Sequence, residues 1–180
     1  MNREELKVKA DFTKVFEEKT KEIFSLEANR ERIAELTYNN YMKSFGCSQS
    51  MLSAFQEVLG FQDDFWFKAV GTLQGGGLSG LTCGALVTGL LLIGGRVGRN
   101  SLDEGMQGML PAFPPCQELT NWFKPMYKST VCSEITGINW FDMNEVVNHF
   151  LGPEAMEAHE KCAQLTGGTA YKVVEILSQL

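Results

Sequence analysis

The sequence predicts an all-α fold, a single compact multi-helix domain around a central glycine-rich buried helix, with an N-terminal amphipathic helical extension. Apolar residues near the N-terminus recur at helical spacings of three, four and seven. Capping residues and glycines bracket the later apolar segments, and the alternation typical of half-buried strands is rare. We expect the helical extension at residues 1–37 and a cysteine-containing all-α domain at residues 38–180.

The composition is that of a globular protein with one core. A chain of 180 residues can bury such a core, and its 44% hydrophobic and 21% charged residues differ from the profile of disordered chains. The net charge is -6, and the basic residues near the N-terminus alternate with acidic ones. Because no basic patch is available for a phosphate backbone, we expect no nucleic-acid partner.

The sequence also favours the cytoplasm over a membrane or a secreted form. The first residues, MNREELKVKADFTKVFEEKTKE, lack the apolar core of a secretory signal. The apolar run at residues 78–95 has a dense core, at residues 85–93, that is far shorter than the ~20 residues a bilayer crossing needs. We therefore expect no membrane span and a cytoplasmic protein.

The N-terminal segment predicts an amphipathic helix or helix pair. Such an apolar stripe either packs on its own domain or pairs with a second copy, so a homodimer through the N-terminal helices is one possibility. The stripe consists of Phe12, Val15, Phe16, Ile23, Leu26, Ile33, Leu36 and Tyr41. A second helix is expected over residues 48–59, with Ser48 as its N-cap and Gly60 at its C-terminal end.

The central helix is expected over residues 79–93, with Ser79 as its cap and no proline inside it. Prolines at 111, 114 and 115 interrupt the segment that follows, before a helix resumes to about residue 127. Three short helices close the chain, and glycines separate them. Their expected ranges are 142–150, 153–165 and 169–180.

The glycine run before the central helix has the spacing G-x-G-x-x-G at Gly75, Gly77 and Gly80. A dinucleotide fingerprint also needs a second strand ending in an acidic residue ~20 positions later, and that region reads GGRVGRNSLDEG. No Gly-Lys-Ser/Thr sequence of a P-loop occurs either. A nucleotide site is therefore disfavoured.

Small residues at Gly80, Gly84 and Thr88 share one face of the expected helix. Such a face allows the close approach of another backbone or of a compact inorganic group. Simple helix packing and cofactor contact both remain open on this pattern. The candidate cofactor-binding residues are Gly75, Gly76, Gly77, Gly80 and Gly84.

Five cysteines occur, but none forms a C-x-x-C pair, and each taken singly reads as a small core residue. Four lie in segments that together resemble the C_GCAxxG_C_C family of redox-active proteins. These segments are NNYMKSFGCSQSMLSAF, GGGLSGLTCGALVTGLLLIG, VCSEITGINW and EKCAQLTGGTAYKVVEIL. The resemblance covers residues 38–180, and the glycine–cysteine signature is its most specific part.

The resemblance implies a redox-active protein with Cys47, Cys83, Cys132 and Cys162 as catalytic or metal-ligating residues and an unidentified redox partner protein. Cys116 has no counterpart in the pattern and is expected to be structural. Two chemistries suit four such thiols. They hold an iron–sulfur cluster for one-electron transfer, or they cycle between dithiol and disulfide, with Cys47 activated at a helix N-terminus.

We favour the cluster because each segment brings one cysteine and no two are close in sequence. Zinc held by the same thiolates is a further alternative, and so is a small-molecule binding protein with structural cysteines. His159 lies three residues before Cys162, as a partner of the site or as solvated surface, and the surface is the more common place for such a histidine. Glu134, beside Cys132, is expected to be an exposed carboxylate.

Overall fold

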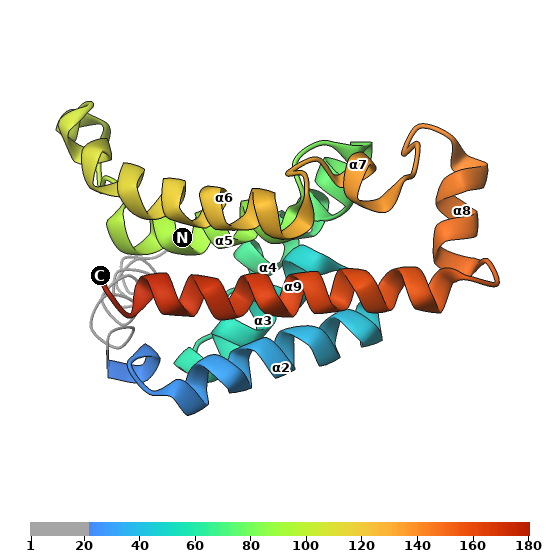
Figure 1. The fold of residues 1–180 in the computed structure, drawn as a ribbon. Helices are drawn as coiled ribbons and strands as arrows, with labels where there is room; N and C mark the ends of the chain where they lie inside the picture. Colours follow the sequence, from blue (N-terminus) through green and yellow to red (C-terminus); the bar gives the residue numbers. More distant parts are fainter. Residues whose placement is uncertain (1–21) are drawn as a thin grey trace.

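Two long helices, α2 (Glu27–Ser44) and α9 (Ala155–Leu177), lie side by side along the molecule. The structure is a computed structural model that describes residues 22–180. Helix α9 also packs against α5 (Gly84–Val97) and α6 (Phe113–Tyr127), and α3 (Cys47–Leu59) contacts both α2 and α5 (Figure 1). The predicted all-α fold in one compact domain is confirmed.

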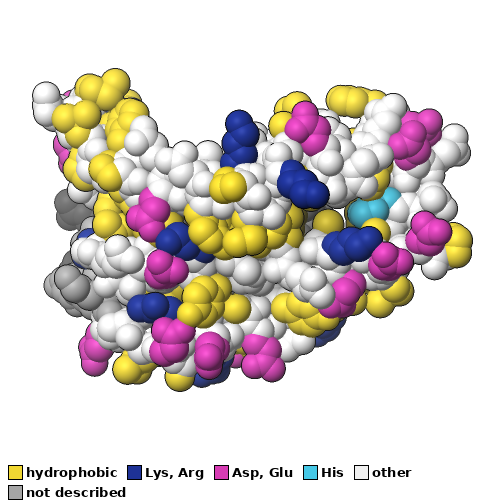
Figure 2. Space-filling view, viewed as in Figure 1, with side chains coloured by type: hydrophobic (Ala, Val, Ile, Leu, Met, Phe, Trp, Pro, Cys, Tyr) yellow, Lys and Arg dark blue, Asp and Glu magenta, His cyan; other side chains and the backbone are white. Residues whose placement is uncertain are grey.

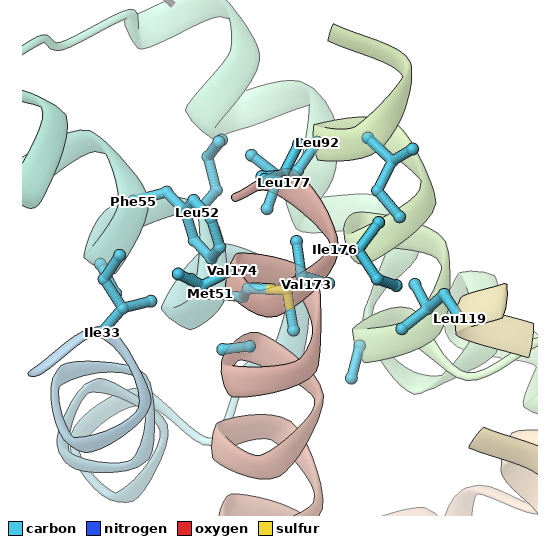
Figure 3. Packing of buried hydrophobic residues seen from close by; sticks show 14 of the residues in the cluster. Ile33, Met51, Leu52, Phe55, Leu92, Leu119, Val173, Val174, Ile176 and Leu177 are labelled. Carbon is cyan, nitrogen blue, oxygen red and sulfur yellow. The ribbon is translucent and has the colours of Figure 1, made fainter. Parts of the chain in front are cut away.

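The core lies where these helices meet. Figure 3 shows side chains from several of them pointing toward one another. Met51 and Phe55 come from α3, Leu119 from α6 and Val173 from α9, and all four are fully buried. Burying such a side chain contributes about 1.5–3 kcal/mol, so these contacts hold the bundle together.

Helix α3 begins one residue earlier than predicted. Gly46 is its N-cap, Cys47 its first residue, and Gly60 caps its C-terminus at φ 72°, as the sequence indicates. Ser48 is not the cap, because its hydroxyl is buried inside the fold and donates to the carbonyl of Val70. The short helix α4 (Asp64–Val70), which we did not predict, begins after its N-cap Asp63 and leads into the 3₁₀ turn η1 (Gly71–Leu73).

The central helix begins later than predicted, at Gly84 instead of residue 79. Residues 75–78 all have positive φ angles, and Gly80 does too. These residues make a left-handed turn, η2 (Gly76–Gly80), which the Leu81 N–H closes by donating to the Gly76 carbonyl. Glycines permit this conformation at no steric cost, so the glycine run reverses the chain before the right-handed helix starts.

An isolated antiparallel bridge between Thr82 and Val131 follows the left-handed turn. The Cys83 N–H donates to the Thr130 carbonyl at 2.8 Å, and the Cys132 N–H donates to the Leu81 carbonyl at 2.6 Å. This bridge joins the segment before α5 to the segment before α7 (Cys132–Thr136). Cys132 is the first residue of α7, a short helix between residues 127 and 142 that we did not predict.

The prolines that were expected to interrupt this segment instead lie in a 3₁₀ turn, at Pro111, and in the first turn of the helix that follows directly, at Pro114 and Pro115. Two 3₁₀ turns, η3 (Leu102–Glu104) and η4 (Gln107–Ala112), precede α6, which carries Pro114 and Pro115 in its first turn. Proline is tolerated there because the first N–H groups of a helix have no partner inside it. Helix α8 (Met143–Leu151) follows the N-cap Asp142, close to the predicted range.

The last two predicted helices are one helix. Helix α9 continues through Gly167 and Gly168 without interruption. A methyl group at Gly167 would lie 3.0 Å from the Ala34 carbonyl oxygen, and one at Gly168 would lie 2.7 Å from the Tyr127 hydroxyl. The prediction of a break was wrong because these glycines serve close packing of α9 against α2 and α6.

The described part of the N-terminal stripe packs inward. Ile33 and Tyr41 are buried and Leu36 packs on the core, whereas Leu26 is exposed. Phe12, Val15 and Phe16 lie outside the described residues. Helix α2 continues across the expected boundary after residue 37. The division at that boundary and pairing with a second copy both stay predictions.

The helices are too short or too polar for the membrane span whose absence the sequence predicts, within the part of the chain that the structure describes. Within residues 22–180, no helix combines the length and the apolar character that a bilayer crossing requires. The most apolar helix, α5, has 14 residues, against the ~20 needed.

Two glycines of α5 allow a test of this packing. A methyl group at Gly89 would lie 2.8 Å from both Leu119 Cδ2 and Val173 Cγ2, whereas one at Gly94 would meet nothing within 4 Å. We expect Gly89→Ala to lower the free energy of unfolding by about 1–3 kcal/mol and Gly94→Ala to raise it by about 0.5–1 kcal/mol. Urea unfolding of both variants measures this, and equal effects would contradict the packing.

Candidate functional site

The four predicted cysteines line one cavity of about 110 Å³. They come from four separate elements, namely the start of α3, the segment before α5, the start of α7 and the middle of α9. Burial leaves Cys83 and Cys132 at 6% and 7% exposed, with Cys47 and Cys162 half-buried. All four are free thiols. Residues spread along the chain from position 47 to 162 therefore meet at a single place.

Backbone structure explains how three of these cysteines meet. Cys47 is the first residue of α3, Cys83 is the N-cap of α5, and Cys132 is the first residue of α7. The antiparallel bridge pairs Thr82 with Val131, so Cys83 and Cys132 lie diagonally across it and on the same face. Three helix N-termini, which favour negative charge, are thus directed to one place.

Cys162 joins the site from α9 and has a side-chain partner of its own. The Tyr41 hydroxyl hydrogen-bonds to Cys162, which favours the thiolate at that position. The same hydroxyl lies 3.3 Å from His159 Nδ1. Tyr41 is buried and lines the cavity, so α2 supplies a polar group to a site that we expected α3, α5, α7 and α9 to form.

Gly84 sets how closely α3 and α5 approach at the cavity. A methyl group at Gly84 would lie 2.7 Å from Cys47 Sγ and 2.7 Å from the Leu73 carbonyl oxygen. Such distances are too short for any side chain, so only glycine leaves room for the Cys47 sulfur. Gly84 was among the predicted cofactor-binding residues, and its contact is with a cysteine of the cavity.

The left-handed turn holds an indole ring. A methyl group at Gly75 would lie 2.5 Å from Trp140 Cζ3, and one at Gly80 would lie 2.7 Å from Trp140 Cδ1. Gly76 faces the backbone of Leu81, and Gly77 faces open space. Of the predicted glycines, Gly75 lines the cavity directly, and Gly80 supports Trp140, which lines it as well. The contacts of Gly77 give no reason to assign it to the site.

Burial raises the pKa of every thiol in the cavity. The pKa of Cys47 rises from 9.0 to about 11 and that of Cys132 to about 12, and those of Cys83 and Cys162 also rise. Neighbouring thiolates add to the effect, because charge on Cys47 raises the pKa of both Cys83 and Cys132. The predicted activation of Cys47 at a helix N-terminus is therefore wrong, since desolvation outweighs the N–H groups that lower its pKa.

Those N–H groups nevertheless face the sulfur atoms. The backbone N–H groups of Gly75 and Ser48 hydrogen-bond to Cys47, and those of Ala85 and Leu86 do so to Cys83. By contrast, no Lys, Arg, Asp or Glu is present among the described residues that line the cavity. The cavity thus offers partial positive charge from backbone dipoles but no full charge to balance four thiolates.

Two side chains of the cavity have buried atoms without a hydrogen-bond partner among residues 22–180, Trp140 Nε1 and Gln74 Oε1. Sequence reasoning identified neither residue, and it also missed Tyr41 as a member of the site. A single Trp, Tyr or Gln in a helical sequence carries no spacing signal. The indications were that Tyr41 lies in the first cysteine segment and Trp140 at the end of the third.

The structure contradicts the prediction for His159 and agrees with those for Glu134 and Cys116. His159 is fully buried and stacks on Phe45 at a ring-centroid distance of 3.9 Å, so its expected surface position is wrong. Burial lowers the pKa of His159 to about 4. Glu134 is exposed, as expected, and accepts from Ser129. Cys116 lies half-buried on α6, away from the cavity, in line with a structural role.

A second, more open cavity of about 350 Å³ adjoins the first. Cys162 and His149 line both cavities, whereas Cys47, Cys83 and Cys132 line only the first. Glu154, Glu157 and Lys161 surround the second one. In Figure 2, histidine atoms are visible at the end of the molecule where Figure 1 places α8, among acidic side chains. Of the four cysteines, Cys162 is the one that also lines this more open cavity.

The four thiols of the cavity are a donor set that can hold a metal group. Across residues 22–180, no three His, Cys, Asp or Glu side chains are close enough together to hold a single metal ion. Four thiols around one cavity are nevertheless the usual ligand set of an iron–sulfur cluster. The space that Gly84 leaves and the unpartnered Trp140 N–H also fit a bound group with sulfur acceptors. The four-thiol donor set therefore fits an iron–sulfur cluster, and four thiolates are also a ligand set for zinc.

The raised thiol pKa values predict a loss of stability in alkali for the metal-free protein. Between pH 9 and about 11, Cys47 in the unfolded chain loses its proton while folded Cys47 keeps it, so rising pH favours unfolding. One such group lowers the free energy of unfolding by up to roughly 1.4 kcal/mol per pH unit. We expect the free energy of unfolding to fall less steeply with pH in Cys47→Ala than in the unaltered chain, as measured by urea unfolding at pH 8–11. Equal slopes of the free energy against pH in the two proteins would contradict the raised pKa of Cys47.

Gly84 and Gly77 form a matched pair for testing the cavity wall. Gly84→Ala should displace the Cys47 sulfur, whereas Gly77→Ala, at φ 70° and with open space around it, should add only backbone strain of about 1–2 kcal/mol. We therefore expect faster alkylation of Cys47 by iodoacetamide in folded Gly84→Ala and an unchanged rate in folded Gly77→Ala. Mass spectrometry of the alkylated peptides measures both rates, and equal rates would contradict the contact.

Comparison with known proteins agrees with the cysteine pattern. A family model described as "Putative redox-active protein (C_GCAxxG_C_C)" matches residues 45–176, a range that contains all four cysteines of the cavity. Searches of curated proteins and of solved structures found no match. Because the family model spans most of the chain, this protein belongs to the C_GCAxxG_C_C family of redox-active proteins.

Proposed function

We propose that Cys47, Cys83, Cys132 and Cys162 hold an iron–sulfur cluster and that the protein transfers one electron at a time between redox partner proteins of the cytoplasm. The observation that carries this proposal is the convergence of the four thiols on one cavity, to whose lining residues 22–180 contribute no Lys, Arg, Asp or Glu. Family membership supports the redox character of the protein. The cluster and the compartment are our own inference.

Charge balance is the main physical argument for a metal group. Four thiolates in a buried cavity repel one another, and burial already raises the pKa of Cys47 to about 11 and that of Cys132 to about 12. Iron supplies the positive charge that neither Lys nor Arg supplies at the lining of this cavity. Binding would therefore release the thiol protons, and its free energy would add to the stability of the fold.

When bound, the cluster supplies a one-electron couple whose potential depends on burial, charge and hydrogen bonds to sulfur. The chain supplies the hydrogen-bond donors to sulfur, the lining of the cavity and the approach for a partner protein. Backbone N–H groups of Gly75, Ser48, Ala85 and Leu86 donate toward the sulfur atoms of Cys47 and Cys83. The apolar lining limits access of water. Cys162, which lines the second cavity as well, is the ligand nearest to an approaching electron carrier protein.

The alternatives have less support. Disulfide exchange needs a thiol with a lowered pKa to begin, and each cysteine of the cavity has a raised one. Zinc in the same four-thiolate cage suits this chain less well, because no two of these cysteines form the close C-x-x-C pair of typical zinc sites. A binding protein with purely structural cysteines leaves their convergence on a single cavity without a reason.

Anaerobic purification tests the proposal directly. We expect brown protein with iron and acid-labile sulfide in about equal amounts, and an absorption band that dithionite bleaches. Cys47→Ser, Cys83→Ser, Cys132→Ser and Cys162→Ser should each lose most of the iron. Cys116→Ser is the matched control, because Cys116 lies outside the cavity, and it should keep the iron of the unaltered chain. Colourless protein that holds zinc or no metal would refute the cluster.

A further inference from the structure

Trp140 has a buried donor that the fold leaves without an acceptor. Its indole Nε1 is inaccessible to solvent and has no hydrogen-bond partner in the part of the chain that the structure describes. Leaving a buried donor unpaired costs about 1–3 kcal/mol, so native proteins rarely keep one without a reason. Trp140 lines the cavity of the four cysteines, and this cavity is the space in which an acceptor can lie.

The surroundings hold the indole ring in one orientation. Gly75 and Gly80 of the left-handed turn approach it so closely that a methyl group at either would overlap the ring. On the α8 side, the ring makes edge contacts with His149 and Phe150, at centroid distances of 6.0 and 6.3 Å. A ring fixed in this way presents its N–H in a constant direction, so the donor is preorganised.

We propose that Trp140 is a positioning residue whose indole N–H donates a hydrogen bond to a sulfur atom of the iron–sulfur group held by the four cysteines. This inference rests on the proposed function. Tryptophan can only donate, so it favours an electron-rich acceptor and offers nothing to a bare cation. Thiolate and sulfide sulfur carry negative charge, and hydrogen bonds to charged acceptors are about twice as strong as neutral ones.

The bond gives Trp140 a defined effect on redox behaviour. Reduction adds one electron, and its negative charge is shared by the sulfur atoms, so a donor to sulfur stabilises the reduced form more than the oxidised form. Trp140 therefore raises the reduction potential. No bond is made or broken in this step, because the electron comes from a one-electron reductant such as dithionite and the N–H proton stays on the indole nitrogen.

Trp140→Phe tests the inference, because phenylalanine retains an aromatic ring between Gly75 and Gly80 and removes the N–H. We expect the equilibrium constant for reduction to fall about tenfold, which corresponds to about 59 mV for a one-electron couple. The matched control is Trp122→Phe, in which the same change is made on α6 beside Tyr127 and outside the cavity. Its potential should equal that of the unaltered protein. Potentials are measured by anaerobic spectroelectrochemical titration at fixed pH.

The outcomes separate this inference from the proposed function. If the unaltered protein contains no iron and sulfide, the proposed function fails and the role of Trp140 fails with it. If the unaltered protein contains a cluster and Trp140→Phe has the same potential, only the role of Trp140 is overturned. That second result would be expected if a water molecule accepts from Nε1 in place of sulfur.

A second measurement applies if Trp140→Phe does not fold or load. In the double variant Trp66→Phe with Trp122→Phe, Trp140 is the last tryptophan, because the chain has only three. Ultraviolet resonance Raman spectra report hydrogen bonding of its indole N–H. We expect a hydrogen-bonded signal in the iron-loaded protein and a weaker one in the metal-free protein. An identical signal in both states would overturn the inference.

Discussion

The two backbone hydrogen bonds that flank Thr82 and Val131 are the constraint on which the candidate site depends. They join two segments that are almost fifty residues apart and fix Cys83 and Cys132 on the same face of a minimal bridge. Each segment then enters a helix at once, so both cysteines lie where a helix begins. With Cys47 at the start of α3, three of the four thiols owe their positions to backbone geometry, and only Cys162 projects from the middle of a helix.

Burial and charge act against each other in this cavity. The apolar lining keeps the thiols protonated, whereas the helix N-termini and backbone N–H groups favour negative charge on the same sulfur atoms. Desolvation dominates as long as no cation is present, which is why the pKa of Cys47 rises although α3 begins at that residue. Under the proposed function, iron would supply positive charge and reverse this balance, and the N–H groups are already in place for it. Gly84 and the left-handed turn provide the room for this arrangement.

The helical class could be predicted because spacing and capping residues carry it. The four cysteines, by contrast, were singled out only by their resemblance to the family pattern, and Gly84 was expected to contact a cofactor rather than the Cys47 sulfur. The start of the central helix could not be predicted, since a glycine run is compatible with helix packing as well as with the left-handed turn observed at residues 75–78. Gly167 and Gly168 suggested a break for the same reason, and the close approach of α2 and α6 keeps the helix intact there. Trp140, Tyr41 and Gln74 reach the cavity only through tertiary contacts, which no local pattern encodes.

The unbroken course of α9 has a consequence for the life of the protein in a cell. Cys162 lies on the same continuous helix as Val173 and Leu177, which are buried in the core near the C-terminal end of α9. If the proposed cluster binds in the cavity, its binding free energy would therefore stabilise the whole cooperatively folded bundle against unfolding. Proteases cleave the transiently unfolded chain. A molecule that has not received the proposed cluster would unfold more often, so cellular proteases would degrade it first.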